Sequence, residues 1–257
     1  INYSPNYAMY SVYTKMFGGY EKTMHFNEKL SIDIEELISS INLKTRFIVI
    51  SNPGHNGVVI SQKKILKLLK FSSKNKTLIF VDEAYVDFTN ISMIDYINDF
   101  SNLVVIRTMS KGFGLASLRV GYIVACKKII DEVYKAKPVH EISGLAAKIG
   151  KHLIENIYIK DDYVEQLKIG KDILIKNFKE MGIHYLPTDA NFIYFKIDKK
   201  IDQNIIYNEL LNKKIFIRSK SKIHPFYDYL RVTIGDKTQM QFFCSELKKI
   251  IKKIKNL

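Results

Sequence analysis

Two short apolar runs, each followed at once by polar side chains, constrain the fold of this 257-residue chain most strongly. The runs 78–81 and 103–106 are continuous and rich in β-branched residues, a pattern typical of strands buried on both faces of a parallel sheet. Asp82 and Tyr85 follow the first run, whereas Thr108, Ser110 and Lys111 follow the second. Because parallel strands present functional groups at their carboxyl ends, we expect these five side chains to share one site.

The rest of the chain predicts an α/β protein in two parts. Residues 1–130 predict a mostly parallel sheet flanked by helices, and residues 131–257 predict a smaller C-terminal α+β domain. The boundary is placed where long charged helices begin and Lys137-Pro138 breaks the pattern. In the first part we expect helices at 31–41, capped by Ser31, and at 61–69, and further strands at 47–50 and 119–125. In the second part we expect helices at 142–158, 163–181 and 203–211, strands at 192–196, 215–218 and 229–234, and a closing helix.

Composition argues against two classes of partner. A net charge of +14 is compatible with binding to nucleic acid, but the lysines are spread along the chain rather than clustered. The one dense cluster, 248–255, is interleaved with apolar residues at helical spacing and indicates the solvated face of an amphipathic helix. No apolar stretch approaches the roughly 18 residues that span a bilayer. We therefore predict no nucleic-acid partner and no membrane segment.

The two cysteines bear on location. Cys126 and Cys244 lie far apart in apolar settings, which is typical of free thiols in a reducing cytoplasm. The sequence therefore favours a cytoplasmic protein. No metal site is predicted.

Two segments then resemble a known family. The segment T-M-S-K-G-F-G-L-A-S-L-R-V-G-Y at 108–122 and the segment D-E-A-Y at 82–85 resemble the cofactor-binding segments of class I and II aminotransferases, particularly those like histidinol-phosphate aminotransferase. The resemblance extends over almost the whole chain. It implies pyridoxal 5'-phosphate as cofactor, the corresponding type I fold, and a homodimer.

The resemblance also implies a role for each matching residue. Lys111 would form the Schiff base with the cofactor and then act as a free amine that moves a proton. Asp82 would be the anion beside the protonated ring nitrogen, and Tyr85 would donate a hydrogen bond to the phenolic oxygen of the ring. The resemblance implies four other cofactor contacts. Tyr7, in the segment S-P-N-Y-A-M-Y, would stack on the ring. Thr108 would also contact the cofactor, and Ser110 and Arg119 would bind its phosphate.

One loop departs from the family pattern. The family has an asparagine in an N-P-T-G context beside the phenolic oxygen, whereas this chain has S-N-P-G-H-N-G at 51–57. Aligning on Gly57 puts Gly54 at that position, so Asn52 and Asn56 are displaced candidates, and Asn52 is taken as a cofactor contact. His55 is a candidate substrate contact, the alternative being an ordinary histidine of a surface turn. The family's N-terminal glycine-containing turn is also missing, so we expect the large domain to lack its N-terminal part.

The substrate end is suggested by L-R-V-T-I-G at 230–235. It resembles the family element whose arginine receives the substrate's anionic group, which makes Arg231 the match and Arg218 a secondary one. We therefore predict transamination of a small, phosphorylated amino acid or amine. Two alternatives stay open: decarboxylation of a phospho-amino acid such as phosphoserine or phosphothreonine, and a catalytically inactive relative.

Overall fold

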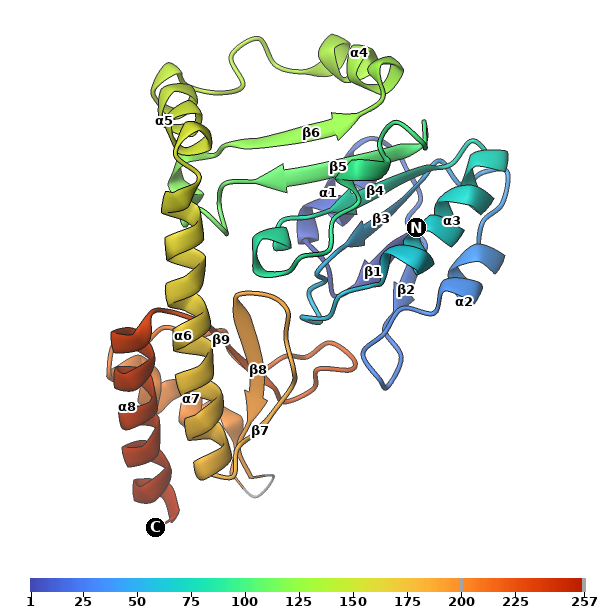
Figure 1. Cartoon of the computed structure of the whole chain (residues 1–257). Helices are drawn as coiled ribbons and strands as arrows, with labels where there is room; N and C mark the ends of the chain where they lie inside the picture. The colour runs from blue at the N-terminus through green and yellow to red at the C-terminus, as the bar shows by residue number, and fades with distance from the viewer. Residues whose placement is uncertain (199–200, 256–257) are drawn as a thin grey trace.

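The structure, a computed structural model, describes residues 1–198 and 201–255 and contains two sheets within those ranges (Figure 1). The larger has six strands in the order β2-β1-β3-β4-β5-β6, and the smaller has three in the order β7-β8-β9. The strands of the larger sheet are β1 Asn2–Ser4, β2 Thr23–His25, β3 Phe47–Ser51, β4 Leu78–Asp82, β5 Leu103–Thr108 and β6 Gly121–Ala125. Those of the smaller are β7 His184–Tyr185, β8 Phe192–Lys196 and β9 Leu230–Thr233.

The larger sheet is parallel except at one edge. Strands β1 to β5 pair in parallel, and only β6 pairs antiparallel with β5. The prediction of a mostly parallel sheet is therefore confirmed. Strand β6 begins at Gly121 rather than at Arg119, whose positive φ of 56° takes it out of the extended conformation.

Helices of the first part are α1 Ala8–Met16, α2 Ile34–Ser39, α3 Gln62–Lys74 and α4 Lys127–Ala136. Helix α3 buries Ile65, Leu68 and Leu69 against the strands. Helix α2 begins two residues later than a cap at Ser31 implied, so the prediction of the cap was wrong. Asp33 is the cap, because its carboxylate accepts hydrogen bonds from the amides of Glu35 and Glu36 at 2.9 and 3.1 Å.

The second part consists of long helices around the smaller sheet. They are α5 Gly144–Glu155, α6 Tyr158–Glu180, α7 Gln203–Asn212 and α8 Lys237–Lys255. Figure 1 shows α6 running from the neighbourhood of α5 and β6 down to the smaller sheet, where α8 lies beside it. None of the described helices is both long and apolar enough to cross a membrane.

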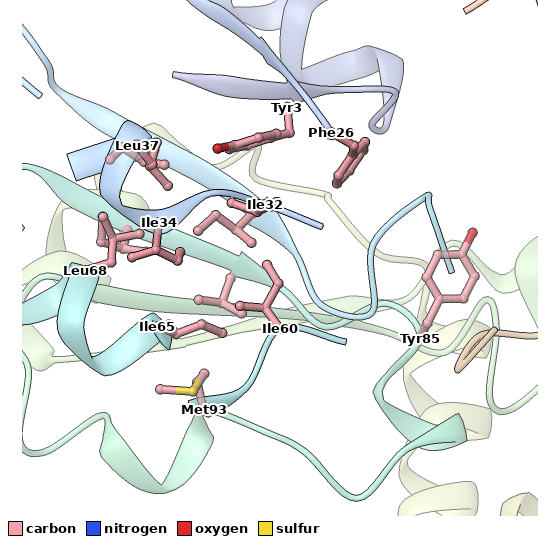
Figure 2. Close-up of a cluster of buried hydrophobic side chains, with 14 of the residues drawn as sticks. Tyr3, Phe26, Ile32, Ile34, Leu37, Ile60, Ile65, Leu68, Tyr85 and Met93 are labelled. Carbon is pink, nitrogen blue, oxygen red and sulfur yellow. The ribbon is translucent and has the colours of Figure 1, made fainter. Parts of the chain in front are cut away.

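Strand β8 contributes to both hydrophobic cores. Phe192 and Tyr194 join the core of the larger sheet, whereas Ile193 and Phe195 join the core between the smaller sheet and its helices. This is the alternation expected of successive strand residues, which point to opposite faces. Figure 2 shows part of the first core, with Tyr85 at one end of the cluster. The domain boundary at residue 130 stays a prediction.

Some predicted elements were wrong or missing. Residues 215–218 form no strand; Arg218 alone makes an isolated bridge to Arg231. The reason is local, since Lys214 adopts a positive φ of 59° and the Ile215 amide is bonded back to Leu210 at the end of α7. Helix α1 and strands β1 and β2 were not predicted. Helix α1 buries none of its residues, although Met9, Val12, Tyr13 and Met16 recur at helical spacing.

Close packing between α6 and the segment after β9 leads to a stability prediction. A Cβ at Gly170 would lie 1.9 Å from the Gly235 carbonyl oxygen, which is backbone and cannot swing away. We expect Gly170→Ala to lower the free energy of unfolding by about 1–3 kcal/mol, measured by urea denaturation. Gly144→Ala is the matched control, because a Cβ there has no neighbour within 4 Å. Equal stability of the two variants would contradict the packing argument.

Candidate active site

The candidate site lies at the carboxyl ends of β3, β4 and β5. Ser51 pairs with Asp82 across β3 and β4, and Thr108 closes β5 in the next strand of the sheet. Since these strands are parallel and adjacent, their last residues share one edge of the sheet, as the sequence predicted.

Asp82 is a buried carboxylate surrounded by donors. Its Oδ2 accepts from the Tyr10 hydroxyl at 2.5 Å and from Ser51 Oγ at 3.5 Å, and its Oδ1 accepts from the Ala84 amide at 3.0 Å. Burial raises the pKa of Asp82, and the hydrogen bond from Tyr10 is the largest influence that opposes the rise. Asp82 is therefore a fixed acceptor whose ionised form depends on the groups that donate to it.

Tyr10 is a site residue that the sequence reasoning missed. It lies one helical turn after Tyr7, and the two rings meet edge to face with centroids 5.7 Å apart. Burial, and then the charge of Asp82, raise the pKa of Tyr10, so this phenol keeps its proton and donates. Tyr7, just before α1, keeps 49% of its surface exposed and has an accessible ring. The spacing Y-x-x-Y at the start of a helix was the signal that could have found Tyr10.

Lys111 and Tyr85 come together beside Asp82. The Lys111 Nζ lies 5.6 Å from the centroid of the Tyr85 ring, and no described residue accepts a hydrogen bond or forms an ion pair with it. Burial lowers the pKa of Lys111, and the charge of Arg231 lowers it further, against the opposing influence of Asp82. The amine is therefore shifted toward its neutral, nucleophilic form.

Arg231 reaches this site from the second half of the chain. It pairs with Tyr194 across β8 and β9, so both side chains lie on the face that joins the core of the larger sheet. Its guanidinium lies 4.7 Å from the centre of the Phe192 ring, and no described carboxylate forms an ion pair with it. Arg218 is bonded to Arg231 through the backbone at 2.9 and 3.3 Å, and its side chain is exposed. Arg231 is thus a cation available to an anionic ligand.

The loop after β3 turns its asparagines inward and leaves a histidine in the site. Asn52 is fully buried; its Oδ1 accepts from the Ile60 amide at 2.7 Å and its Nδ2 donates to the Ile60 carbonyl at 3.2 Å. The Asn56 side chain bonds to the Leu30 carbonyl and the Val58 amide. The prediction that Asn52 contacts the cofactor gains no support from these bonds. His55 instead packs edge to face against Tyr85, with ring centroids 6.0 Å apart.

The loop after β5 groups two hydroxyls but leaves the arginine apart. Thr108 Oγ1 donates to Ser110 Oγ at 2.9 Å and accepts from the Ser110 amide at 3.1 Å. Arg119 is exposed and its Nη1 donates to the Ala116 carbonyl at 3.0 Å. Among the described residues no contact joins Arg119 to Ser110. The structure therefore does not bring these two predicted phosphate ligands together.

Comparison with known proteins identifies the family. The model of the family described as "Aminotransferase class I and II" matches residues 2–247 of this chain. The chain belongs to this family. It is 33% identical over 254 residues to histidinol-phosphate aminotransferase of Clostridium kluyveri, covering 96% of this chain and 70% of that relative.

Solved structures agree on the fold. The histidinol-phosphate aminotransferase of Clostridium acetobutylicum superimposes with a TM-score of 0.89 at 26% identity, covering 97% of this chain and 76% of that one. L-threonine-O-3-phosphate decarboxylase of Porphyromonas gingivalis shares the fold, with a TM-score of 0.80 at 22% identity over 98% of this chain and 76% of that one. This aminotransferase is therefore a transaminase of the pyridoxal-phosphate type I fold, as predicted.

The electrostatics of this aminotransferase site give a pH prediction. The positive charge of Arg231 disfavours the protonated form of Lys111, so Arg231→Gln is expected to raise the pKa of the Lys111 amine toward its ordinary 10.5. Burial is the larger cause and stays, so the rise is partial. The pH dependence of amine modification at Lys111, read by peptide mass spectrometry on cofactor-free protein, measures the change.

Arg218→Gln is the matched control for that experiment. Arg218 is a neighbouring arginine whose charge is not among the influences on the Lys111 pKa. We expect its removal to leave the midpoint in place. A midpoint that moves equally in both variants, or in neither, would contradict the geometry described above.

Proposed function

We propose that this protein transfers the amino group of a small, phosphorylated amino acid or amine, with its cofactor bound covalently through Lys111. One observation carries the proposal. Lys111 is half-buried, lies beside Tyr85 and Asp82, and has no hydrogen-bond partner among the described residues. It also feels the charge of Arg231, which forms no ion pair with any described residue. A lysine set between an anion and an arginine that forms no ion pair within the described part of the chain suits covalent amine chemistry on an anionic substrate.

The residues present fit pyridoxal phosphate. The buried Asp82 carboxylate suits a protonated ring nitrogen, and the Tyr85 hydroxyl suits the ring oxygen. When bound, this cofactor withdraws electrons from the carbon that carries the amino group. We propose that Lys111 then holds a proton at its amine nitrogen and returns it to the substrate carbon, because burial and Arg231 lower its pKa.

Phosphate and ring contacts complete the proposed cofactor site. We propose that the adjoining hydroxyls of Thr108 and Ser110 donate to the cofactor phosphate. Arg119 would add its charge once its side chain turns from the Ala116 carbonyl. Tyr7, half exposed at the start of α1, would cover one face of the ring.

We propose that Arg231 binds the anionic group of the substrate. Stacking on Phe192 holds its guanidinium plane in place, which favours two parallel hydrogen bonds to one carboxylate or phosphate. The exposed Arg218 follows as a second cation. Lys220, a third cation nearby in sequence, already lies 3.6 and 3.8 Å from the carboxylates of Asp202 and Asp228. Lys220 is therefore not a free cation for a substrate phosphate, which favours transamination over decarboxylation.

One experiment separates the three candidate activities. Cofactor-loaded protein is incubated separately with histidinol phosphate, phosphoserine, phosphothreonine and glutamate. We expect conversion of the cofactor to its pyridoxamine form with at least one of them. Lys111→Ala should lower turnover by at least about 10²–10⁴-fold, the usual contribution of a positioned proton-transfer group. Lys63→Ala, an exposed lysine of α3, is the control.

The other outcomes of this experiment decide against the proposal. Release of carbon dioxide with the cofactor left as pyridoxal would establish a decarboxylase. No conversion with any of the four compounds, in protein that carries the cofactor on Lys111, would favour the inactive relative.

We also propose a homodimer. Large apolar side chains stay exposed on α4 and α5, which follow one another along the chain. They include Tyr134 at 64%, Leu145 at 69% and Ile154 at 59%. An apolar surface of this kind is typical of an interaction face. Sedimentation equilibrium of the purified protein is expected to give twice the chain mass. A monomer at every concentration would contradict this.

A cytoplasmic location is proposed on the state of the cysteines. Cys126 and Cys244 are both free, and Cys244 is buried. Unpaired thiols suit a reducing compartment. Cell fractionation followed by detection of the chain is the direct measurement.

A further inference from the structure

The His55 ring carries a buried nitrogen that has no partner. Its Nδ1 is one of three buried side-chain polar atoms among the described residues that form no hydrogen bond. The other two, on Ser72 of α3 and on Asn102 just before β5, lie at the opposite end of the strands from Asp82. An unpartnered buried polar atom destabilises a protein, and the ring that carries this one packs against Tyr85 of the site, so the nitrogen calls for a partner.

The loop fixes His55 from both sides. Asn52, three residues before it, is tied to the Ile60 backbone, and Asn56, directly after it, is tied to Leu30. The Gly57 carbonyl accepts the Asp189 amide at 2.6 Å, which joins the loop to the segment before β8. With its neighbours held, the imidazole stays in place beside Tyr85.

Cations surround this ring. Arg231 from β9, Lys111 from the loop after β5 and Arg218 from the segment before β9 all act on it electrostatically. Burial, and then these charges, lower the pKa of His55 to about 4, so the ring is neutral at ordinary pH. A neutral imidazole has one N–H and one lone pair. Such surroundings attract a negatively charged oxygen, to which the N–H can donate without adding a charge.

We propose that His55 donates a hydrogen bond from its free ring nitrogen to the cofactor oxygen that Tyr85 also contacts. The inference rests on the proposed function, because it needs the cofactor bound at Lys111 beside Tyr85. It assigns to His55 a contact with the cofactor itself, distinct from the substrate contact predicted from the sequence. It also gives the unpartnered nitrogen of His55 a hydrogen-bond acceptor. The side chains of Asn52 and Asn56 cannot take that part, because they are bonded to the backbone.

The proposal has a spectroscopic consequence. With the cofactor joined to Lys111 as proposed, this oxygen would share a proton with the nitrogen that links the two. A donor that stabilises the negative oxygen competes for that shared proton, so it makes the linkage nitrogen easier to deprotonate. His55 therefore lowers the pH at which the visible absorption band of the bound cofactor changes.

The test is a pH titration of that band in cofactor-loaded protein without substrate. His55→Leu removes the donor and should move the midpoint upward by about one pH unit, which corresponds to one charge-assisted hydrogen bond. His55→Asn keeps an N–H donor and should move it less. His25→Leu, at an exposed histidine of β2, is the matched control and should leave it unchanged.

A second measurement avoids dependence on the folding of the variants. In wild-type protein with nitrogen-labelled histidine, cofactor binding should slow the solvent exchange of one ring N–H. That signal should be missing from His55→Asn. A histidine spectrum unaffected by the cofactor would overturn the inference even if His55→Leu failed to fold.

The failures of the two proposals are distinguishable. Wild-type protein that develops no visible band with pyridoxal phosphate would refute the covalent site at Lys111, and His55 with it. A normal band whose midpoint is the same in His55→Leu would refute the role of His55 alone. A variant changed only in its KM for the amino substrate would return His55 to substrate contact and would also overturn this inference.

Discussion

An ion pair between Glu83, directly after β4, and the partly buried Arg107 of β5 holds together the two strand ends on which the site depends. The Glu83 side chain is fully buried and accepts hydrogen bonds from Arg107 Nε and Nη2 at 3.0 and 2.9 Å. The Ser92 hydroxyl and the Met93 amide donate further hydrogen bonds to the same carboxylate. Asp82 and Thr108 are the adjacent residues, and successive residues of an extended chain point to opposite faces. The pair therefore fixes the strands from one face while the other face presents the site. Charged groups this deeply buried are tolerated only when paired and hydrogen-bonded.

Strand β8 then couples this edge to the second half of the chain. Because its residues alternate between two cores, its pairing register with β9 determines which face Arg231 occupies. A slip of one residue would turn Arg231 toward the second core and away from Lys111. The substrate arginine is thus placed by the packing of a strand that contributes no reacting group itself.

The chemistry of the site could be predicted only where sequence and position coincide. Asp82 is the last residue of β4, and Tyr85 and Lys111 come three residues after the ends of β4 and β5, so locating the strands located them. Tyr10 could not be placed in this way, because its contact with Asp82 spans 72 positions of the sequence. The loop 51–57 was equally ambiguous. Asn52 has the polar chemistry expected of a ligand, but its fully buried amide closes the loop, and the His55 ring packs against Tyr85 instead.

The sequence by itself determined the fold class, the family and the order of the functional groups along the chain. Apolar periodicity indicated the fold class locally, because it reports which face of each strand or helix must be buried. The family rested instead on the resemblance of segments 82–85 and 108–122 to those of known aminotransferases. Only the tertiary structure decided which groups meet: Tyr10 with Asp82, His55 with Tyr85, and Arg231 within reach of Lys111. It also decided the protonation preferences of Lys111 and His55. Both depend on burial and on charges brought from distant segments, and local sequence carries no record of either.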